Sequence, residues 1–263
     1  MNLKSIEKIV LPLDGSDLAA TAMPWAGLIS SNTHASIDLV SAVSADDEPT
    51  NLSTLANRLE KSKSKLQSQS PHVSAFAEEG NPPAVIAAHV QRTNADLIVM
   101  ASHGYSGAIE RLLGSVSFWL LRLTTTPVMI VKPQSGPPVV QKILYPLGGG
   151  ISEVEGLELA AGLARDLSTP LSLVHITESS YSAPEKVERY MQALAEQNIE
   201  AEVHVEQGEP KERITQIVND QPGTLVVLES ATSTGIDLTK TGSFAEHLFI
   251  HTTMPTIVLS KVI

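Results

Sequence analysis

The loop at residues 101–117, Ala-Ser-His-Gly-Tyr-Ser-Gly-Ala-Ile-Glu-Arg-Leu-Leu-Gly-Ser-Val-Ser, has the composition of an anion-binding site. Glycine lets the backbone approach a phosphate with no Cβ in the way. The unpaired N–H groups at the start of a helix carry a partial positive charge that complements the phosphate. Gly104 and Gly114, separated by nine residues and followed by Ser115, therefore predict a phosphate site at a helix start.

An ordinary connection between a strand and a helix is the alternative interpretation of this loop. Its glycines and serines would then be turn and cap residues, with Ser115 as the N-cap. A second candidate, Asp14, comes at the end of the first predicted strand, where a carboxylate can accept hydrogen bonds from sugar hydroxyls. Asp14 could equally be a turn residue, and Pro12 before it could simply end the strand.

No arrangement of side chains indicates catalysis. His103 lies in the glycine-rich loop and could act as a general base, but loop histidines commonly face solvent. His247 and His251 have the four-residue spacing of a shared metal site, although no third ligand is evident nearby. The Gly-x-x-x-x-Gly-Lys-Ser/Thr motif of P-loop enzymes is absent from the sequence. We therefore predict no catalytic residue and no protein-bound metal.

The order of the predicted elements is that of an α/β fold. Short β-branched runs alternate with segments of helical period, which is typical of βα units that form a mostly parallel sheet with helices on its faces. In the first half, we expect strands at 9–13, 37–43, 73–77, 97–101 and 128–131, and helices at 18–30, 52–68, 82–92 and 115–123. Pro24 falls inside the first of these helices and predicts a kink.

The second half of the chain repeats the first. Lys-Ile-Leu-Tyr-Pro-Leu at 142–147 mirrors Lys-Ile-Val-Leu-Pro-Leu at 8–13, and Met-Pro-Thr-Ile-Val-Leu at 254–259 mirrors Thr-Pro-Val-Met-Ile-Val at 126–131. Further strands are expected at 171–176, 201–207 and 224–229. The Pro-, Gly- and Ser-rich segment 133–138 suits a short, stiff linker. We therefore predict two tandem domains, residues 1–137 and 138–263.

The second copy lacks the residues that make the first a candidate site. Alignment of the copies puts Glu229 where Ala101 stands and Thr232 where Gly104 stands. A carboxylate repels a phosphate at close range, and threonine restricts the backbone where glycine does not. Because glycine also replaces Asp14, at position 148, we expect the first domain to be the one that binds a ligand.

Composition excludes several classes of function. A net charge of −11 argues against binding to nucleic acid or to an anionic membrane, because both depend on lysine and arginine. The sequence has no cysteine, which excludes disulfides, thiol nucleophiles and zinc-thiolate sites. Charged residues near the start and the lack of a long apolar run predict a soluble, cytoplasmic protein.

The chain resembles a tandem universal stress protein over essentially its whole length. The ATP-binding subclass of that family carries Gly, two residues, Gly, nine residues, Gly and then Ser or Thr. Here the series reads Ala101, two residues, Gly104, nine residues, Gly114 and Ser115, so that alanine replaces the first glycine. The resemblance implies two Rossmann-like domains of the adenine nucleotide alpha hydrolase type, each with a five-stranded, mostly parallel sheet.

The same resemblance implies the contacts of a bound nucleotide. Asp14 would hold the ribose, the backbone near Ala42 would meet the adenine, and Pro12 would shape the adenine side of the pocket. The phosphates would be surrounded by residues of the loop and the helix start, namely Ala101, Gly104, Gly114, Ser115, Val116 and Ser117. The expected cofactor is ATP, accompanied by Mg²⁺.

Three functions remain open from the sequence. The first is a nucleotide-dependent stress-response module whose occupancy is read by an unidentified protein partner. The second is a slow ATP hydrolase or phosphoryl-transfer protein that uses the same pocket, and the third is a structural adaptor that binds no nucleotide. The resemblance also implies that the final strands, at 128–131 and 257–259, pair within an intramolecular pseudo-dimer. Two chains could associate further as a homodimer.

Overall fold

The computed structural model describes residues 1–43, 52–70, 72–102, 114–147, 153–177, 186–229 and 244–260. The strands of the first half, here called the first lobe, are β1 (Lys8–Pro12), β2 (Ser36–Val43), β3 (Val73–Glu79), β4 (Leu97–Ala101) and β5 (Val128–Val131). Those of the second lobe are β6 (Lys142–Leu147), β7 (Leu171–Thr177), β8 (Ala201–Gln207), β9 (Thr224–Glu229) and β10 (Thr256–Leu259).

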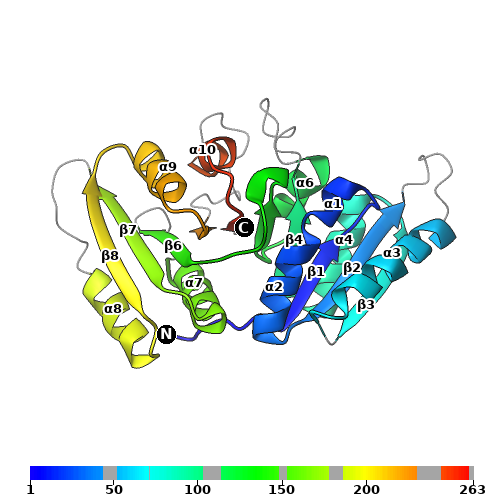
Figure 1. The fold of residues 1–263 in the computed structure, drawn as a ribbon, viewed down its shortest axis with the longest axis horizontal. Coiled ribbons are helices and arrows are strands. Elements are labelled where there is room, and N and C mark those ends of the chain that lie inside the picture. The colour runs from blue at the N-terminus through cyan, green and yellow to red at the C-terminus, as the bar shows by residue number, and fades with distance from the viewer. Residues whose placement is uncertain are drawn as a thin grey trace.

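Helices connect these strands and cover both faces of the sheet in each lobe (Figure 1). The first lobe has α1 (Asp17–Ala20), α2 (Met23–Thr33), α3 (Leu52–Leu66), α4 (Pro82–Thr93) and α6 (Ser115–Leu123). A turn of 3-10 helix, η1 (Pro133–Ser135), follows β5, and the second lobe has α7 (Glu153–Leu167), α8 (Lys186–Glu196), α9 (Pro210–Asp220) and α10 (Phe244–His251). Among these described helices, none is long and apolar enough to cross a bilayer.

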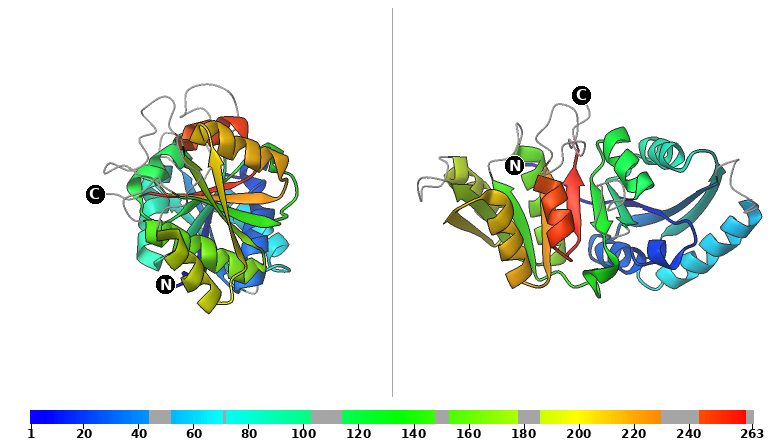
Figure 2. Two further views of the ribbon diagram at one scale, coloured as in Figure 1. Left: turned by 90° about the vertical axis from the view of Figure 1, so that its left-hand side faces the viewer. Right: turned by 90° about the horizontal axis from the view of Figure 1, so that it is seen from above.

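The strands of the two lobes form one sheet in the order β3-β2-β1-β4-β5-β10-β9-β6-β7-β8. Neighbouring strands within each lobe are parallel, as expected when a helix connects them. The lobes meet at β5 and β10, which are antiparallel, with Met129 opposite Ile257; Figure 2 shows these two strands side by side. The predicted pairing of the final strands is confirmed, and it joins the two five-stranded halves into a single sheet.

The prediction of one helix kinked at Pro24 is wrong. The chain forms two helices instead, because α1 ends at Ala20 and α2 begins at Met23. Pro24 lies in the first turn of α2, where a missing backbone N–H costs no helical hydrogen bond. The break lets the short α1 stand beside the end of β1, while α2 packs against the sheet.

One apolar cluster extends through both lobes. It contains Trp25 of α2, which is 1% exposed, together with Ile9 of β1, Leu159 of α7 and Ile257 of β10. On the other face, Phe249 of α10 packs in a cluster made mainly by the first lobe. The lobes therefore share buried apolar surface, and the linker between them does not separate two independent cores.

Polar contacts also tie the lobes together near the linker. Lys132, directly after β5, is 6% exposed, and its Nζ donates to the carbonyl oxygens of Phe249 and Thr252 at the end of α10. The Ser135 hydroxyl donates to the carbonyl of Thr253 at 2.8 Å. Burial lowers the pKa of Lys132 to about 8. The predicted linker is thus anchored on the second lobe through its first residues.

The residues before β1 also connect the two lobes, because they contact α7 of the second lobe. The backbone N–H of Asn2 donates to Glu158 Oε1 at 2.7 Å, and Arg165 donates to the Ser5 hydroxyl at 3.0 Å. The carbonyl of Lys4 lies against Gly162, where a side chain would not fit. The N-terminal segment therefore connects the second lobe directly to the strand that ends at Pro12.

Candidate functional site

A cavity of about 310 Å³ opens in the first lobe where the strand order reverses. The chain runs outward from β1 to β2 and β3, and then returns to place β4 on the other side of β1. In parallel sheets, ligands commonly bind at the carboxyl ends of the strands at such a switch point. The volume lies within the range of about 300–1,000 Å³ that is usual for small-molecule sites.

Eight of the nine residues predicted from the sequence line this cavity, and they come from four separate segments of the chain. They are Pro12, Asp14, Ala42, Ala101, Gly114, Ser115, Val116 and Ser117. The ninth, Gly104, lies outside the described residues, as does His103. The fold thus brings together the ends of β1, β2 and β4 with the start of α6.

Sequence reasoning missed a further set of lining residues. They are Leu13, Ser16, Leu18, Ala19, Val40, Pro82, Ile86 and Met100. The sequence could have predicted two of these residues, Val40 and Pro82. Val40 lies two residues before Ala42 and therefore on the same face of the strand. Pro82 opens a predicted helix that follows an adjacent strand. The apolar members of this set give the cavity walls on which a planar base could pack.

The turn after β1 holds the Asp14 carboxylate in a fixed orientation. Its Oδ1 accepts a hydrogen bond from the backbone N–H of Ser16 at 2.8 Å, and the Ser16 hydroxyl caps α1 by accepting from Ala19 N–H at 3.0 Å. Gly15 between them has φ of +84°, a conformation that favours glycine. The turn and ligand interpretations of Asp14 are therefore compatible, since one oxygen stabilises the turn and the other has no hydrogen-bond partner among the described residues.

Ser115 is not the N-cap of α6, which the interpretation of the loop as an ordinary connection had predicted. Gly114 is the N-cap, with φ of +79°, and Ser115 is the first helical residue. Because glycine has no side chain, it cannot itself cap the first N–H groups of the helix as serine would. Gly114, Ser115, Val116 and Ser117 all line the cavity, so the positive end of the helix dipole lies at its edge.

Asp14 is the one charged residue among the described residues that line the cavity. No lysine or arginine of this described set is available to neutralise a phosphate. An anion here would depend on backbone N–H groups and on a cation brought with it. The described lining also contains no histidine, cysteine or lysine to act as a base or a nucleophile.

The second lobe has a different arrangement at the end of β9. Glu229 stands in the position of Ala101, and the Tyr145 hydroxyl donates to its Oε2 at 3.2 Å. Glu229 is half-buried. The other residues compared in the sequence, Gly148, Thr232 and the Gly-Ser pair at 242–243, lie outside the described residues.

His247 and His251 lie on α10 with their ring centroids 4.4 Å apart. Burial lowers the pKa of His247, and the neighbouring His251 lowers it further. Across the described part of the chain, there is no group of three or more histidine, aspartate or glutamate side chains placed to hold a metal.

The fold defines a tandem α/β protein with a cavity at the switch point of its first lobe. A family model described as "Universal stress protein family" matches residues 5–132 and again residues 140–260. The chain therefore belongs to the universal stress protein family, in the tandem form with two domains.

One curated protein resembles part of the chain in sequence, and solved structures share its fold. Universal stress protein YxiE of Bacillus subtilis (strain 168) is 27% identical over 145 residues, which cover 48% of this chain and 98% of that protein. A universal stress protein from Archaeoglobus fulgidus DSM 4304 has a similar structure, with a TM-score of 0.78 and 19% identity over 98% of this chain and 97% of that chain. The functionally unknown protein PA1789 of Pseudomonas aeruginosa PAO1 has a TM-score of 0.67 and 21% identity, over 97% and 92% of the two chains.

Proposed function

We propose that the first lobe binds an adenine nucleotide, ATP with Mg²⁺, and that the chain acts as a nucleotide-dependent binding module in a stress response. The observation that carries the proposal is the convergence of eight predicted residues on one cavity at the switch point of the sheet. The residues come from motifs as far apart in the sequence as 12–14 and 114–117.

The chemistry of the cavity fits each part of the nucleotide. Asp14 offers an oriented carboxylate to the ribose hydroxyls, and apolar side chains of β2, α4 and β4 offer a surface to the base. The backbone at Gly114 has no Cβ to hold a phosphate away from the helix start. Mg²⁺ would enter with the phosphates, because the described lining supplies no cationic side chain to balance their charge.

A role in binding is favoured over one in hydrolysis because the described lining holds no histidine, cysteine or lysine, and its one carboxylate, that of Asp14, is assigned to the ribose. Occupancy of the pocket would instead change the surface around α6 that an unidentified protein partner contacts. Bound Mg²⁺ would supply charge neutralisation, while the residues of this chain bind and orient the nucleotide.

Isothermal titration calorimetry with MgATP tests the proposal. Wild-type protein should bind one ATP per chain, and Gly114→Ala should weaken binding by about tenfold or more, a loss of about 1.4 kcal/mol. Gly136→Ala is a matched control, because Gly136 also has a positive φ, of +69°, but has open space around its Cα and lies outside the cavity lining. Equal affinity for Gly114→Ala and Gly136→Ala, or no saturable binding by the wild-type chain, would contradict the proposal.

A further inference from the structure

An exposed apolar stripe runs along α6 of the first lobe. Trp119 and Leu123 are 48% and 50% exposed and lie four residues apart, on one side of the helix. Ser115, four residues before Trp119, is exposed on the same side and lines the cavity described above. The stripe therefore leads from the edge of the cavity to the end of α6.

A groove of about 660 Å³ continues the stripe. It lies between α4 and the end of α6, which pack side by side (Figure 2). Among the described residues that line it there is no charged side chain. Both helices contribute apolar surface to the lining, namely Ala84, Ala87, Ala88 and Leu123. Because alanine side chains are small, the backbone of another chain can approach α4 closely at this groove.

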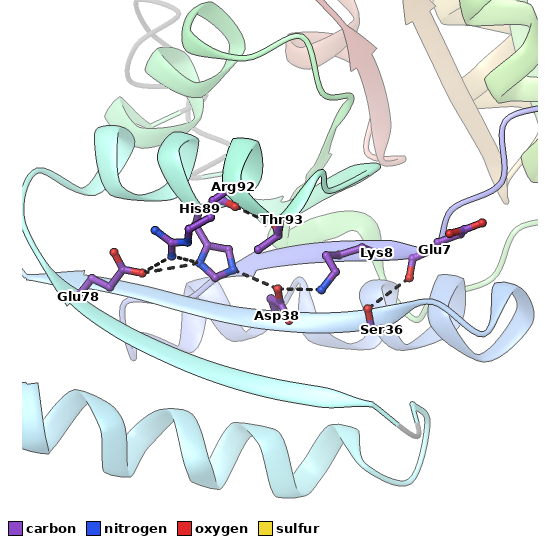
Figure 3. Close-up of polar contacts among 8 residues, drawn as sticks. All are labelled: Glu7, Lys8, Ser36, Asp38, Glu78, His89, Arg92 and Thr93. Carbon is purple, nitrogen blue, oxygen red and sulfur yellow. Dashed lines mark hydrogen bonds and ion pairs between the residues drawn. The ribbon is translucent and has the colours of Figure 1, made fainter.

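The helix that forms one wall of the groove is anchored to the sheet (Figure 3). His89 of α4 and Asp38 of β2 are 1% and 3% exposed, and His89 Nε2 lies 3.1 Å from Asp38 Oδ2. At the end of the same helix, Arg92 Nη2 lies 2.8 Å from Oε1 of Glu78 on β3. The wall is therefore tied to two strands, and the charge of Arg92 already has a carboxylate partner.

Arg122 of α6, next to Leu123, is a cation without such a partner. Its Cζ lies 4.4 Å from the ring centroid of Phe118 and 6.0 Å from that of Trp119, so the two aromatic rings position the guanidinium. Within the described part of the chain, this guanidinium forms no ion pair and no hydrogen bond. Tryptophan and arginine are enriched among the residues that dominate the binding energy of protein interfaces. The stripe thus combines exposed apolar surface with one unpaired positive charge.

The second lobe shows that the fold does not require this surface. Its helices α9 and α10 correspond to α4 and α6, and the repeat places His247 at the position of Trp119 and His251 at that of Leu123. There Asn219 Nδ2 donates to the carbonyl oxygen of His251 at 3.0 Å, which bridges the two helices where the first lobe has its groove. The apolar stripe and the open groove are therefore particular to the first lobe.

The chemistry of this surface identifies the occupant that it fits. An amphipathic helix binds in an apolar groove through side chains spaced three or four residues apart. The unpaired Arg122 favours a helix that carries a carboxylate beside its apolar side. A second copy of this chain that met the first through the same surface would supply no such carboxylate, because neither α4 nor α6 contains an acidic residue. Two half-exposed side chains also fall far short of the about 800 Å² that each partner buries in a stable dimer.

We propose that the surface formed by α4 and the exposed side of α6, here called the α4–α6 face, binds an amphipathic helix of another protein. Apolar side chains of that helix fill the groove beside Leu123, and one of its carboxylates pairs with Arg122. The inference names the kind of partner for a chain that acts by binding, and it rests on the proposed function for that role.

Two synthetic helical peptides of about 18 residues, or five turns, test the inference with the full chain. Both carry the same stripe of leucines, flanked by glutamates in the acidic peptide and by lysines in the basic peptide. Fluorescence anisotropy in the absence of nucleotide should show that the wild type binds the acidic peptide about tenfold more tightly than the basic one. The net charge of −11 acts against this preference, so the preference would come from the local cation.

Three variants locate the binding. Arg122→Glu should reverse the preference, so that the basic peptide binds more tightly than the acidic one. Leu123→Gln should weaken binding of the acidic peptide by about tenfold. Ile250→Gln is the matched control, because Ile250 is an apolar residue of α10 that is 44% exposed and lies outside the groove lining, and it should bind like the wild type.

Several results would overturn the inference. They are a wild-type chain that binds neither peptide or both equally, an unchanged preference in Arg122→Glu, and equal losses in Leu123→Gln and Ile250→Gln. Sedimentation that shows a wild-type dimer which dissociates in Leu123→Gln would assign the α4–α6 face to a second copy and also overturn it.

Calorimetry with MgATP separates this inference from the proposed function. Leu123 does not line the cavity, so Leu123→Gln should bind ATP like the wild type while it loses the peptide. ATP binding by a wild-type chain that does not discriminate between the peptides would overturn this inference alone. The expected peptide binding by a wild-type chain that does not bind ATP would overturn the proposed nucleotide site and leave the α4–α6 face as a docking surface.

Discussion

The carbonyl oxygen of Lys4 approaches Gly162 so closely that a Cβ built on Gly162 would lie 2.0 Å from it. Lys4 belongs to the segment before β1, and Gly162 belongs to α7 of the second lobe. A glycine in a helix interior is unfavourable by about 1 kcal/mol relative to alanine. Glycine at position 162 therefore makes α7 less stable as a helix but allows the close contact between the lobes.

We expect Gly162→Ala to destabilise the protein although alanine is the better helix former. The added methyl group would collide with a backbone atom that cannot rotate away, and overpacking of this kind costs about 1–3 kcal/mol. Urea unfolding followed by circular dichroism measures the change. An increase in the free energy of unfolding would mean that the N-terminal segment is not held on α7.

The buried Lys132 predicts a rise in stability at alkaline pH. Its pKa is about 8 in the folded chain and 10.5 when unperturbed, so below pH 8 both states carry the proton and the contribution is constant. Between these values the unfolded chain binds more protons, so the free energy of unfolding increases with pH, by about 3 kcal/mol at most. Urea unfolding of the wild type and of Lys132→Met at pH 7.5 and pH 10 isolates this effect. Identical pH dependence in the two proteins would contradict it.

Removal of the Asp14 carboxylate should weaken nucleotide binding. Asp14→Ala loses the proposed ribose contact, and a hydrogen bond to a charged group contributes about 1.5–3 kcal/mol, which corresponds to a loss of about 10- to 100-fold in affinity. Asp17→Ala is the control, because Asp17 is an exposed acid in the first turn of α1 that is absent from the cavity lining. Fluorescence titration with a labelled ATP compares the two variants, and equal losses would reject a specific contact at Asp14.

Ile257 in the last strand should affect the stability of the first lobe. It is fully buried in the cluster that also holds Trp25, and Ile257→Ala should cost about 2–4 kcal/mol through the cavity that it leaves. Both tryptophans, Trp25 and Trp119, lie in the first lobe, so tryptophan fluorescence during urea unfolding reports on that lobe, and its transition should move to lower urea. A fluorescence transition that stays in place, while amide exchange shows that the second lobe has been weakened, would mean that the lobes unfold independently.

Much of the fold could be predicted because the strands are short apolar runs with clear ends. The bounds predicted for β4, β5, β8 and β9 agree with the structure, and β1 differs by a single residue at each end. The prediction at Pro24 was wrong because proline kinks or breaks a helix in its interior but is favoured in its first turn. Local sequence could not distinguish these cases, since the break between α1 and α2 depends on how the chain turns after β1.

The site could be predicted in part. Residues that follow a motif, such as Asp14 and Gly114, were found, whereas Ile86 and Met100 were missed because an apolar lining residue looks like any other core residue. Asp38 did carry a signal, as a charged residue inside an otherwise apolar strand. Its partner His89 lies 51 residues further along the chain, and only the packing of α4 on β2 brings the two together.

The antiparallel pairing of β5 with β10 has a further consequence, because both strands belong to one polypeptide. Two separate subunits joined in this way would come apart on dilution, whereas these halves are tethered and remain together however scarce the protein is. The tether also fixes their ratio and prevents either half from exchanging its companion for another.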